Sequence, residues 1–349
     1  MRSLPAFGGV RTLLADMHDE PHNPAALNDR TVCVTGATGF VGGHTVRALL
    51  AAGWRVRALV RSPEKGAALR DDRVETVRGD VFDAGAMRDL AAGAAAMVHL
   101  IGIRMERKGG VTFQRMHVEA TRAALAAAEA GGVRRYVQMS ALGVRPNGPC
   151  AYYQTKHEAE TLVRRSGLDW TILRPSLIHG PDGEFMQMIK GWATAKAPPF
   201  LFLPYFERLR FDPNPLMPPK GEVPLAQPVA VQDVAGAVCA ALEREDAVGE
   251  IFPLGGPDVI AWPDLLETVR DALPGAKRWM AAMSIPGVVA QGVAIGAAAV
   301  GLDGLLPFGP SEAVMGTEDN VCSNEKARLQ LGFDPQPFAP LVRAYAAQI

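Results

Sequence analysis

The chain has 349 residues, 48% of them hydrophobic, and a formal net charge of −1 from 36 basic and 37 acidic residues. This length and composition suffice for one large domain or two modest ones. The balanced charge produces no global field that favours nucleic acid or an anionic membrane, and we expect no nucleic-acid partner. The four cysteines lie far apart without a metal-binding spacing. They predict free thiols, no metal site and a cytoplasmic location.

Residues 1–28 mix proline, glycine, histidine and charged residues without a period. Their apolar stretches are too short for a secretory signal peptide, and acidic residues argue against a transit peptide. We expect a loose N-terminal arm.

A glycine-rich turn follows the first expected strand, residues 31–35. Glycines at 36, 39 and 42 allow a tight turn, close approach to a pyrophosphate, and packing of the next helix against the sheet. The helix that follows, residues 43–50, offers free N–H groups to phosphates. The turn therefore predicts dinucleotide binding, with these expected contacts: Gly36, Thr38, Gly39, Phe40, Val41 and Gly42.

Strands and helices then alternate along the chain. The further expected strands are residues 56–60, 74–77, 97–101, 135–139, 170–173 and 250–254, and the further helices are residues 113–130, 152–166 and 234–242, the last capped by Asp233. Such alternation predicts right-handed βαβ units. The expected fold class is α/β, a Rossmann-like doubly wound parallel sheet with ligands at the carboxyl ends of its strands.

The alternation stops after Pro175. Residues 197–228 are rich in proline and aromatic residues, which predicts a long irregular loop over the sheet. The predicted domains are a dinucleotide-binding domain of residues 29–175 and 229–256, and a smaller, discontinuous C-terminal substrate or interaction region of residues 176–228 and 257–349.

Residues 279–302 contain no charged side chain. A stretch of this length is a candidate transmembrane span, but its proline and four glycines weaken that interpretation. The alternatives are a helix that lies on a bilayer or a partner protein, and an ordinary buried helix.

Tyr152 and Lys156 are spaced i and i+4, so both side chains lie on one face of the expected helix. An ammonium near the phenol is expected to lower its pKa, so that it can exchange a proton with a substrate oxygen. The alternative is an exposed tyrosine beside a solvated lysine. The pair lies on the helix that follows the fifth strand of a dinucleotide-binding fold, and this position favours the catalytic interpretation.

Several motifs resemble the short-chain dehydrogenase/reductase superfamily, in the extended or atypical branch that includes NAD-dependent epimerases and dehydratases. The matching segments are residues 35–42, 79–80, 98–100, 140, 152–156, 174–176 and 227–235. A closer resemblance, to the nucleotide-binding accessory subunit of respiratory complex I and its bacterial relatives, is carried by residues 140–143, 155–156, 174–176, 180–182, 319–321 and 331–333.

The resemblance implies roles for individual residues. Tyr152 and Lys156 would be the catalytic pair, with Lys156 also on the cofactor ribose, and Asp80 would contact the adenine. The remaining implied cofactor contacts are Val81 and Pro175. Ser140 would orient a substrate oxygen, although the family often places this hydroxyl one or two residues later. His117 stands where extended members often have asparagine, and we expect a satisfied helical histidine there.

The charge of the residues after the second strand indicates whether the cofactor is NAD or NADP. Members that bind NAD usually place an acidic residue after the second strand, whereas this chain has Arg61 and Ser62 there. Arg61 can pair with a 2′-phosphate, and the alternative is a solvated surface arginine. We therefore expect NADP(H) rather than NAD(H).

Three functions follow as hypotheses. The first is an NADPH-dependent oxidoreductase acting on a small apolar carbonyl or quinone-like substrate. The second is a non-catalytic, nucleotide-binding accessory or assembly protein of a respiratory complex, with a membrane complex or membrane surface as its partner and a location on the inner face of a membrane. The third is a nucleotide-sugar epimerase or dehydratase, for which Lys190, Lys196, Arg208 and Arg210 are candidate diphosphate ligands.

Overall fold

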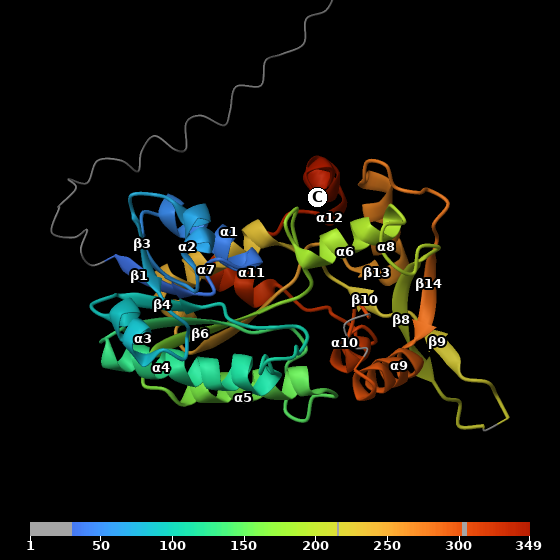
Figure 1. Cartoon of the computed structure of the whole chain (residues 1–349), viewed down its shortest axis with the longest axis horizontal. Helices are drawn as coiled ribbons and strands as arrows, with labels where there is room; N and C mark the ends of the chain where they lie inside the picture. The colour runs from blue at the N-terminus through green and yellow to red at the C-terminus, as the bar shows by residue number, and fades with distance from the viewer. Residues whose placement is uncertain (1–29, 215, 302–305) are drawn as a thin grey trace, which may run out of the picture.

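The computed structural model describes residues 30–214, 216–301 and 306–349, so the predicted arm of residues 1–28 lies outside the described residues. Seven parallel strands form the main sheet in the order β12-β6-β5-β4-β1-β2-β3 (Figure 1). They are β1 (Thr31–Thr35), β2 (Arg55–Val60), β3 (Val74–Arg78), β4 (Ala96–His99), β5 (Arg135–Met139), β6 (Asp169–Pro175) and β12 (Glu250–Leu254). The doubly wound α/β prediction is confirmed.

Helices cover both faces of the main sheet (Figure 1). One face carries α1 (Phe40–Ala51), α7 (Val231–Glu243) and α11 (Glu325–Leu331), and the other carries α3 (Ala84–Ala91), α4 (Ala120–Ala130) and α5 (Ala151–Arg165). A short α2 (Pro63–Gly66) follows β2. Because both faces are covered, the central strands are apolar along nearly their whole length, and all four residues of β4 are buried.

The strand register brings the carboxyl ends of the central strands to one edge. Thr35 at the end of β1 pairs with His99 of β4, and His99 pairs with Gln138 of β5. Thr35 Oγ1 and His99 Nδ1 are 2.7 Å apart in this buried layer. Ligands of doubly wound sheets bind at this edge, so the register fixes where a site can be.

A second lobe lies at the other end of the molecule (Figure 1). Its elements are β7 (Ile178–His179), α6 (Glu184–Ala193), β8 (Leu203–Arg210), β9 (Lys220–Glu222), β10 (Leu225–Ala226), β11 (Val229–Ala230), β13 (Ile260–Ala261), α8 (Trp262–Ala272), β14 (Ala282–Pro286), α9 (Gly287–Ala299), α10 (Pro310–Met315) and α12 (Phe338–Tyr345). Its separate core joins α6, α8 and α12, with Ile189, Leu266 and Val342 fully buried.

The prediction of an irregular loop over residues 197–228 is wrong for much of its length. The eight-residue strand β8 lies inside it and pairs with β9 and, in parallel, with β14. The partner β14 begins about 70 residues further along the chain. A local sequence pattern does not reveal so distant a partner, and the prolines masked the strand.

The predicted helix cap at Asp233 is also wrong. Helix α7 begins at Val231, three residues earlier than predicted, and Ala230 is the residue that precedes it. The Asp233 carboxylate instead accepts a hydrogen bond from the backbone N–H of Gln336 (2.9 Å). The side chain therefore ties the C-terminal segment to α7.

The uncharged stretch of residues 279–302 contains strand β14 and the 13-residue helix α9, and its last residue, Leu302, lies outside the described residues. Across the described part of the chain, no helix combines the length and apolar character needed to cross a bilayer. The prediction of an ordinary buried helix is wrong, because only Gly287, Ala290 and Ala294 of α9 are buried.

The domain boundaries stay a prediction. Helix α11 falls in the range that we assigned to the C-terminal region, yet it packs against α7 and β12 of the main sheet. The chain thus returns to the first lobe near its end.

Candidate functional site

The glycine turn joins β1 to α1 in the form that the sequence predicts. Gly36 has φ of +76°, a backbone conformation that L side chains rarely adopt. A Cβ on Gly42 would lie 2.1 Å from the Gly36 carbonyl oxygen, so the turn and helix α1 could not pack this closely with any side chain there.

The end of α1 next to this turn is suited to an anion. The residue before the helix, Gly39, is exposed and provides no side-chain cap, so the first N–H groups of α1 have no side-chain acceptor from it. Phe40 packs against a second turn, with its ring 3.1 Å from where a Gly180 Cβ would lie. Val41 instead packs against the hydrophobic core. These features fit the phosphates of a dinucleotide.

The ends of β2 and β3 carry the next predicted residues. Arg61 is exposed directly after β2, and Asp80 is exposed shortly after β3, whereas Val81 is buried. The Asp80 carboxylate accepts from the backbone N–H of Phe82 (3.2 Å). Arg78, which we did not predict, ends β3 directly beside Val60 at the end of β2. Two arginines therefore stand at this edge.

Tyr152 and Lys156 lie in the first turns of α5, which begins after Cys150. The Lys156 ammonium is buried and donates to the Met139 carbonyl at the end of β5 (3.2 Å). A Cβ on Gly102 would lie 3.0 Å from Lys156 Nζ, so the ammonium lies in close contact with the backbone there. Burial lowers the pKa of Lys156 to about 8, although the nearby Glu160 carboxylate opposes this.

Tyr152 is half-buried among aromatic side chains. Its ring meets Phe113 and His117 edge to face, with centroids 5.8 and 5.4 Å apart, and it also contacts Tyr153. Burial raises the pKa of the Tyr152 phenol, and the neighbouring Tyr153 hydroxyl adds to this. The direction is opposite to the lowering that we expected from Lys156, so that expectation is wrong for this structure.

His117 belongs to a six-residue π-helical segment, Gln114–Glu119, that precedes α4. Its Nδ1 is 2.9 Å from Thr155 Oγ1, and its Nε2 is 2.9 Å from the Ile103 carbonyl oxygen. Burial lowers the pKa of His117 to about 2, with the Lys156 charge adding to the effect. The side chain is satisfied and neutral, and single-turn π segments are frequent at functional sites.

Ser140 has a partner that the sequence analysis missed. Its hydroxyl donates to the fully buried Glu160 carboxylate (2.6 Å), one helical turn after Lys156. The Arg174 guanidinium holds the same carboxylate through Nε (2.8 Å) and Nη2 (2.6 Å). The spacing of Tyr152, Lys156 and Glu160 at i, i+4 and i+8 was the signal in the sequence that could have identified Glu160.

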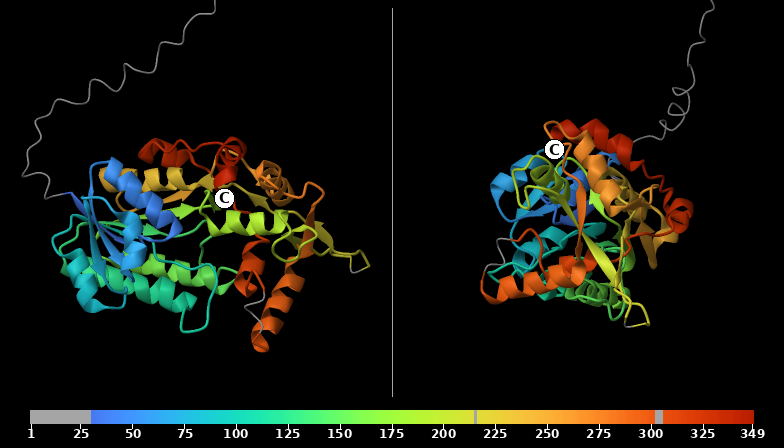
Figure 2. Two further views of the ribbon diagram at one scale, coloured as in Figure 1. Left: turned by 45° about the horizontal axis from the view of Figure 1, so that its top comes forward. Right: turned by 90° about the vertical axis from the view of Figure 1, so that its right-hand side faces the viewer.

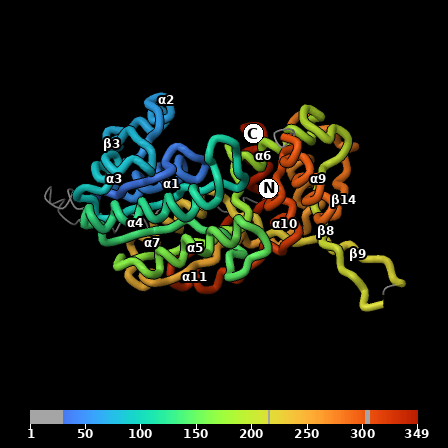
Figure 3. Tube along the Cα trace, turned by 60° about the horizontal axis from the view of Figure 1, so that its bottom comes forward, coloured from blue at the N-terminus to red at the C-terminus, as the bar shows by residue number. Residues whose placement is uncertain are grey.

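Helix α10 closes the site from the second lobe. Val314 and Met315 of α10 pack against the buried cluster of Val144, Cys150 and Tyr153, against which Tyr152 also packs. The Arg104 guanidinium joins the two lobes by pairing with Glu312 of α10 and with Glu184 of α6 (3.2 Å). Seen from below, α10 lies between α5 and α9 (Figure 3).

Comparison with known proteins agrees with this geometry. A model of the NAD(P)H-binding family matches residues 36–191. The chain is 37% identical over 171 residues to a ceramide reductase of Caulobacter vibrioides, covering 49% of this chain and 53% of that protein. It is 29% identical over 267 residues to the mitochondrial NADH dehydrogenase [ubiquinone] 1 alpha subcomplex subunit 9 of Arabidopsis thaliana, covering 75% of this chain and 61% of that protein.

Residues 36–191 are thus similar to the NAD(P)H-binding family, and the chain has the fold of the extended short-chain dehydrogenases/reductases. Its fold matches that of an Escherichia coli NADPH-dependent quinone oxidoreductase complexed with NADPH, with a TM-score of 0.67, 17% identity, and coverage of 90% of this chain and 99% of that one. The matched parts of the two sequence relatives span little more than half of those proteins.

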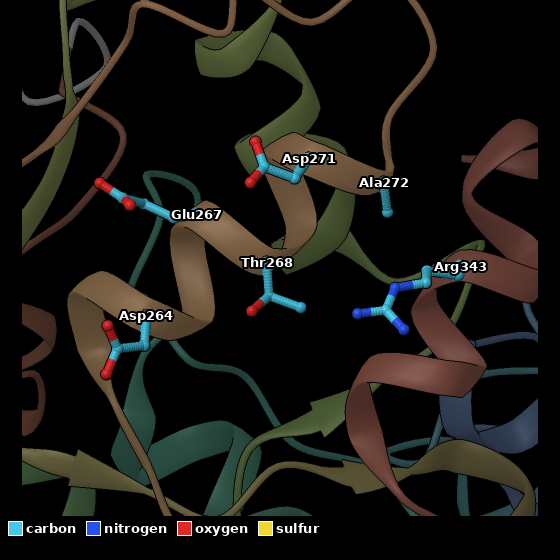
Figure 4. Close-up of a pocket in the computed structure, with 6 residues that line it drawn as sticks. All are labelled: Asp264, Glu267, Thr268, Asp271, Ala272 and Arg343. Carbon is cyan, nitrogen blue, oxygen red and sulfur yellow. The ribbon is translucent and has the colours of Figure 1, made fainter.

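Pro175, the last predicted contact of this dinucleotide-binding fold, ends β6 and is buried, opposite Leu254 of β12. It thus stands at the same carboxyl edge as Ser140 and Lys156. A surface hollow of about 340 Å³ lies elsewhere, on α8 and α12. Asp264, Glu267 and Asp271 lie along α8, and Arg343 of α12 extends toward Thr268 (Figure 4); none of our predicted site residues lines this hollow.

Proposed function

We propose that the chain is an NADPH-dependent reductase of an apolar carbonyl or quinone-like substrate. The observation that carries the proposal is the placement of Tyr152 and Lys156 one turn apart on α5, beside the carboxyl edge of a sheet that bears a dinucleotide-binding glycine turn. The similarity to a ceramide reductase supports the reaction class.

NADPH would supply the hydride when bound. Gly36, Gly39 and Gly42 would hold its pyrophosphate, Asp80 its adenine, and Lys156 its ribose. The other proposed contacts are Thr38, Phe40, Val41, Val81 and Pro175.

The protonation states favour reduction over oxidation. Because burial raises its pKa, the Tyr152 phenol holds its proton at neutral pH and can donate it to a substrate oxygen. The Lys156 ammonium, with its pKa near 8, remains charged at neutral pH and would donate hydrogen bonds to the cofactor ribose. Ser140 then serves as a positioning residue through Glu160.

The preference for NADPH is supported by two arginines. Arg61 and Arg78 end neighbouring strands, where the family places the adenosine ribose. Guanidinium groups bind phosphate through paired, charge-assisted hydrogen bonds, so a 2′-phosphate gains partners there that a 2′-hydroxyl does not need.

An apolar substrate is supported by the side chains around Tyr152. Phe113 and Tyr153 are its aromatic neighbours, and Val314 and Met315 contribute from α10. The basic residues suggested for a sugar diphosphate are largely engaged elsewhere. Arg208 and Arg210 pair with Glu222, and the Lys190 ammonium donates to the Ile349 carbonyl. These contacts favour an apolar substrate over the sugar diphosphate of the epimerase hypothesis.

The second candidate is a nucleotide-binding accessory protein without turnover. The 267-residue similarity to the NADH dehydrogenase subunit favours it. In that case the same turn would bind a dinucleotide for stability alone, and Tyr152 would have no role in a reaction.

NADPH oxidation with a panel of quinones, aldehydes and ketones tests the proposal. Tyr152→Phe removes the proton donor and is expected to lower kcat by about 10²- to 10⁴-fold while NADPH binding stays unchanged. Tyr153→Phe is the matched control, because it removes a phenol oxygen from the neighbouring position of α5 and should leave kcat within about twofold. NADPH binding without turnover on every substrate class would favour the accessory protein instead.

A further inference from the structure

Helix α9 presents an apolar face to solvent. Val288, Val289, Val293 and Ile295 are each between 52% and 60% exposed, and the rest of the exposed face consists of alanine and glycine. Surface helices of globular proteins normally carry charged residues on the side away from the core. A contiguous exposed apolar patch of this kind marks an interaction site.

A second apolar group lies at the tip of the hairpin between β8 and β9. Phe211, Leu216 and Met217 are 71%, 89% and 48% exposed. The hairpin, strand β14 and helix α9 share the side of the molecule that faces the viewer in the right-hand panel of Figure 2. Strand β14 pairs with β8 and leads directly into α9, so these segments form one unit.

Basic residues accompany both apolar groups. Arg210 and Lys220 are exposed and lie directly opposite each other at the base of the hairpin tip. Like charges in that position destabilise a strand pair, and one glutamate, Glu222, pairs with Arg210 (2.8 Å). The one acidic side chain in the described tip, Asp212, accepts from the Asn214 backbone N–H and so shapes the turn (2.8 Å).

The other basic pair precedes α9. Between Leu273 and Gly301, Lys277 and Arg278 are the only charged residues, and Trp279 directly after them is 62% exposed. Arg278 also pairs with Asp271 (2.9 Å). Tryptophan next to cations and valine-rich apolar surface is the composition that binds the headgroup region of an anionic bilayer.

We propose that α9, the β8–β9 hairpin tip and Trp279 form a docking face for an anionic phospholipid bilayer. The apolar side chains enter the headgroup boundary, and the basic pairs Arg210/Lys220 and Lys277/Arg278 meet the lipid phosphates. The proposal does not depend on catalysis. It also places the bilayer beside the candidate site, because α9 packs on α10 and α10 packs on the buried cluster against which Tyr152 packs.

Vesicle co-sedimentation of the full chain tests the proposal, with phosphatidylcholine vesicles with and without phosphatidylglycerol. We expect binding that requires phosphatidylglycerol and weakens as salt is raised. Val289→Asp with Val293→Asp should weaken this binding at least about tenfold. Each change places a charge on apolar surface that would otherwise enter the bilayer. Leu329→Asp is the matched control, since Leu329 is 77% exposed on α11 of the other lobe, and its binding should not change.

Two further variants guard against a folding effect. Phe211→Ser with Leu216→Ser alters the hairpin tip alone and should also weaken binding. Brominated lipids should quench Trp279 fluorescence, and Trp279→Phe should remove that quenching, because the other four tryptophans are buried or half-buried.

Absence of vesicle binding by the unaltered chain would overturn the proposal, as would equal binding by the double aspartate variant. An oligomer that the double aspartate variant dissociates, with no vesicle binding, would assign the face to a second copy of the chain. Turnover is not measured in any of these experiments, so their failure is independent of a failure to find a substrate.

Discussion

Glu160 links the residues that we assign to chemistry. Its carboxylate accepts from Ser140 and from Arg174, and its charge raises the pKa of Lys156 against the effect of burial. The value of about 8 for Lys156 therefore depends on a neighbour that does not touch the substrate. Glu160 is a positioning residue in this scheme.

The pH profile of kcat/KM should show this dependence. We expect activity to fall above about pH 8, because Lys156 loses its proton there. Glu160→Gln removes the carboxylate that favours the ammonium, so the alkaline limb should move to lower pH. Glu158→Gln is the control, since Glu158 is exposed on the same helix, and its profile should match that of the unaltered chain. A limb that stays in place in Glu160→Gln would contradict this assignment.

Arg61 and Arg78 should decide between the two cofactors. Arg61→Ala with Arg78→Ala is expected to raise the Kd for NADPH by about 10- to 100-fold, the equivalent of one or two charge-assisted hydrogen bonds, and to leave the Kd for NADH nearly unchanged. Arg55→Ala provides the control, because Arg55 is exposed at the opposite end of β2. Titration of both nucleotides measures the effect, and a parallel loss of both affinities would refute the role of the 2′-phosphate.

At the scale of elements, the sequence predicts what depends on local chemistry. The main-sheet strands and the turn at Gly36 follow from periodicity and from glycine positions, and they are confirmed. Strand β8 was missed because its partner β14 is distant in sequence, and Glu160 was missed because its partner Arg174 meets it only in the folded chain. The sequence also did not reveal how deeply Tyr152 is buried, and this burial reverses the expected shift of its pKa.

At the scale of the whole molecule, three neutral histidines are built into the interior. Burial lowers the pKa of His99 to about 3, of His117 to about 2 and of His179 to about 4. His99, at the end of β4, and His117, which contacts α5, both lie near Lys156, whereas the His179 Nδ1 is 2.8 Å from the Tyr345 hydroxyl of α12. Folding therefore requires all three to be uncharged.

The free energy of unfolding should fall as pH falls below about 6.5, the ordinary pKa of histidine. There the unfolded chain binds protons that the folded chain excludes, so each histidine contributes up to about 1.4 kcal/mol per pH unit of lost stability. Urea unfolding at pH 7.5, 6.5 and 5.5 measures this loss, and the highest pH should give the greatest stability. His117→Asn replaces one buried histidine with a group that does not titrate, so its stability should depend less steeply on pH. Equal slopes for the unaltered chain and His117→Asn would show that folding does not lower the pKa of His117.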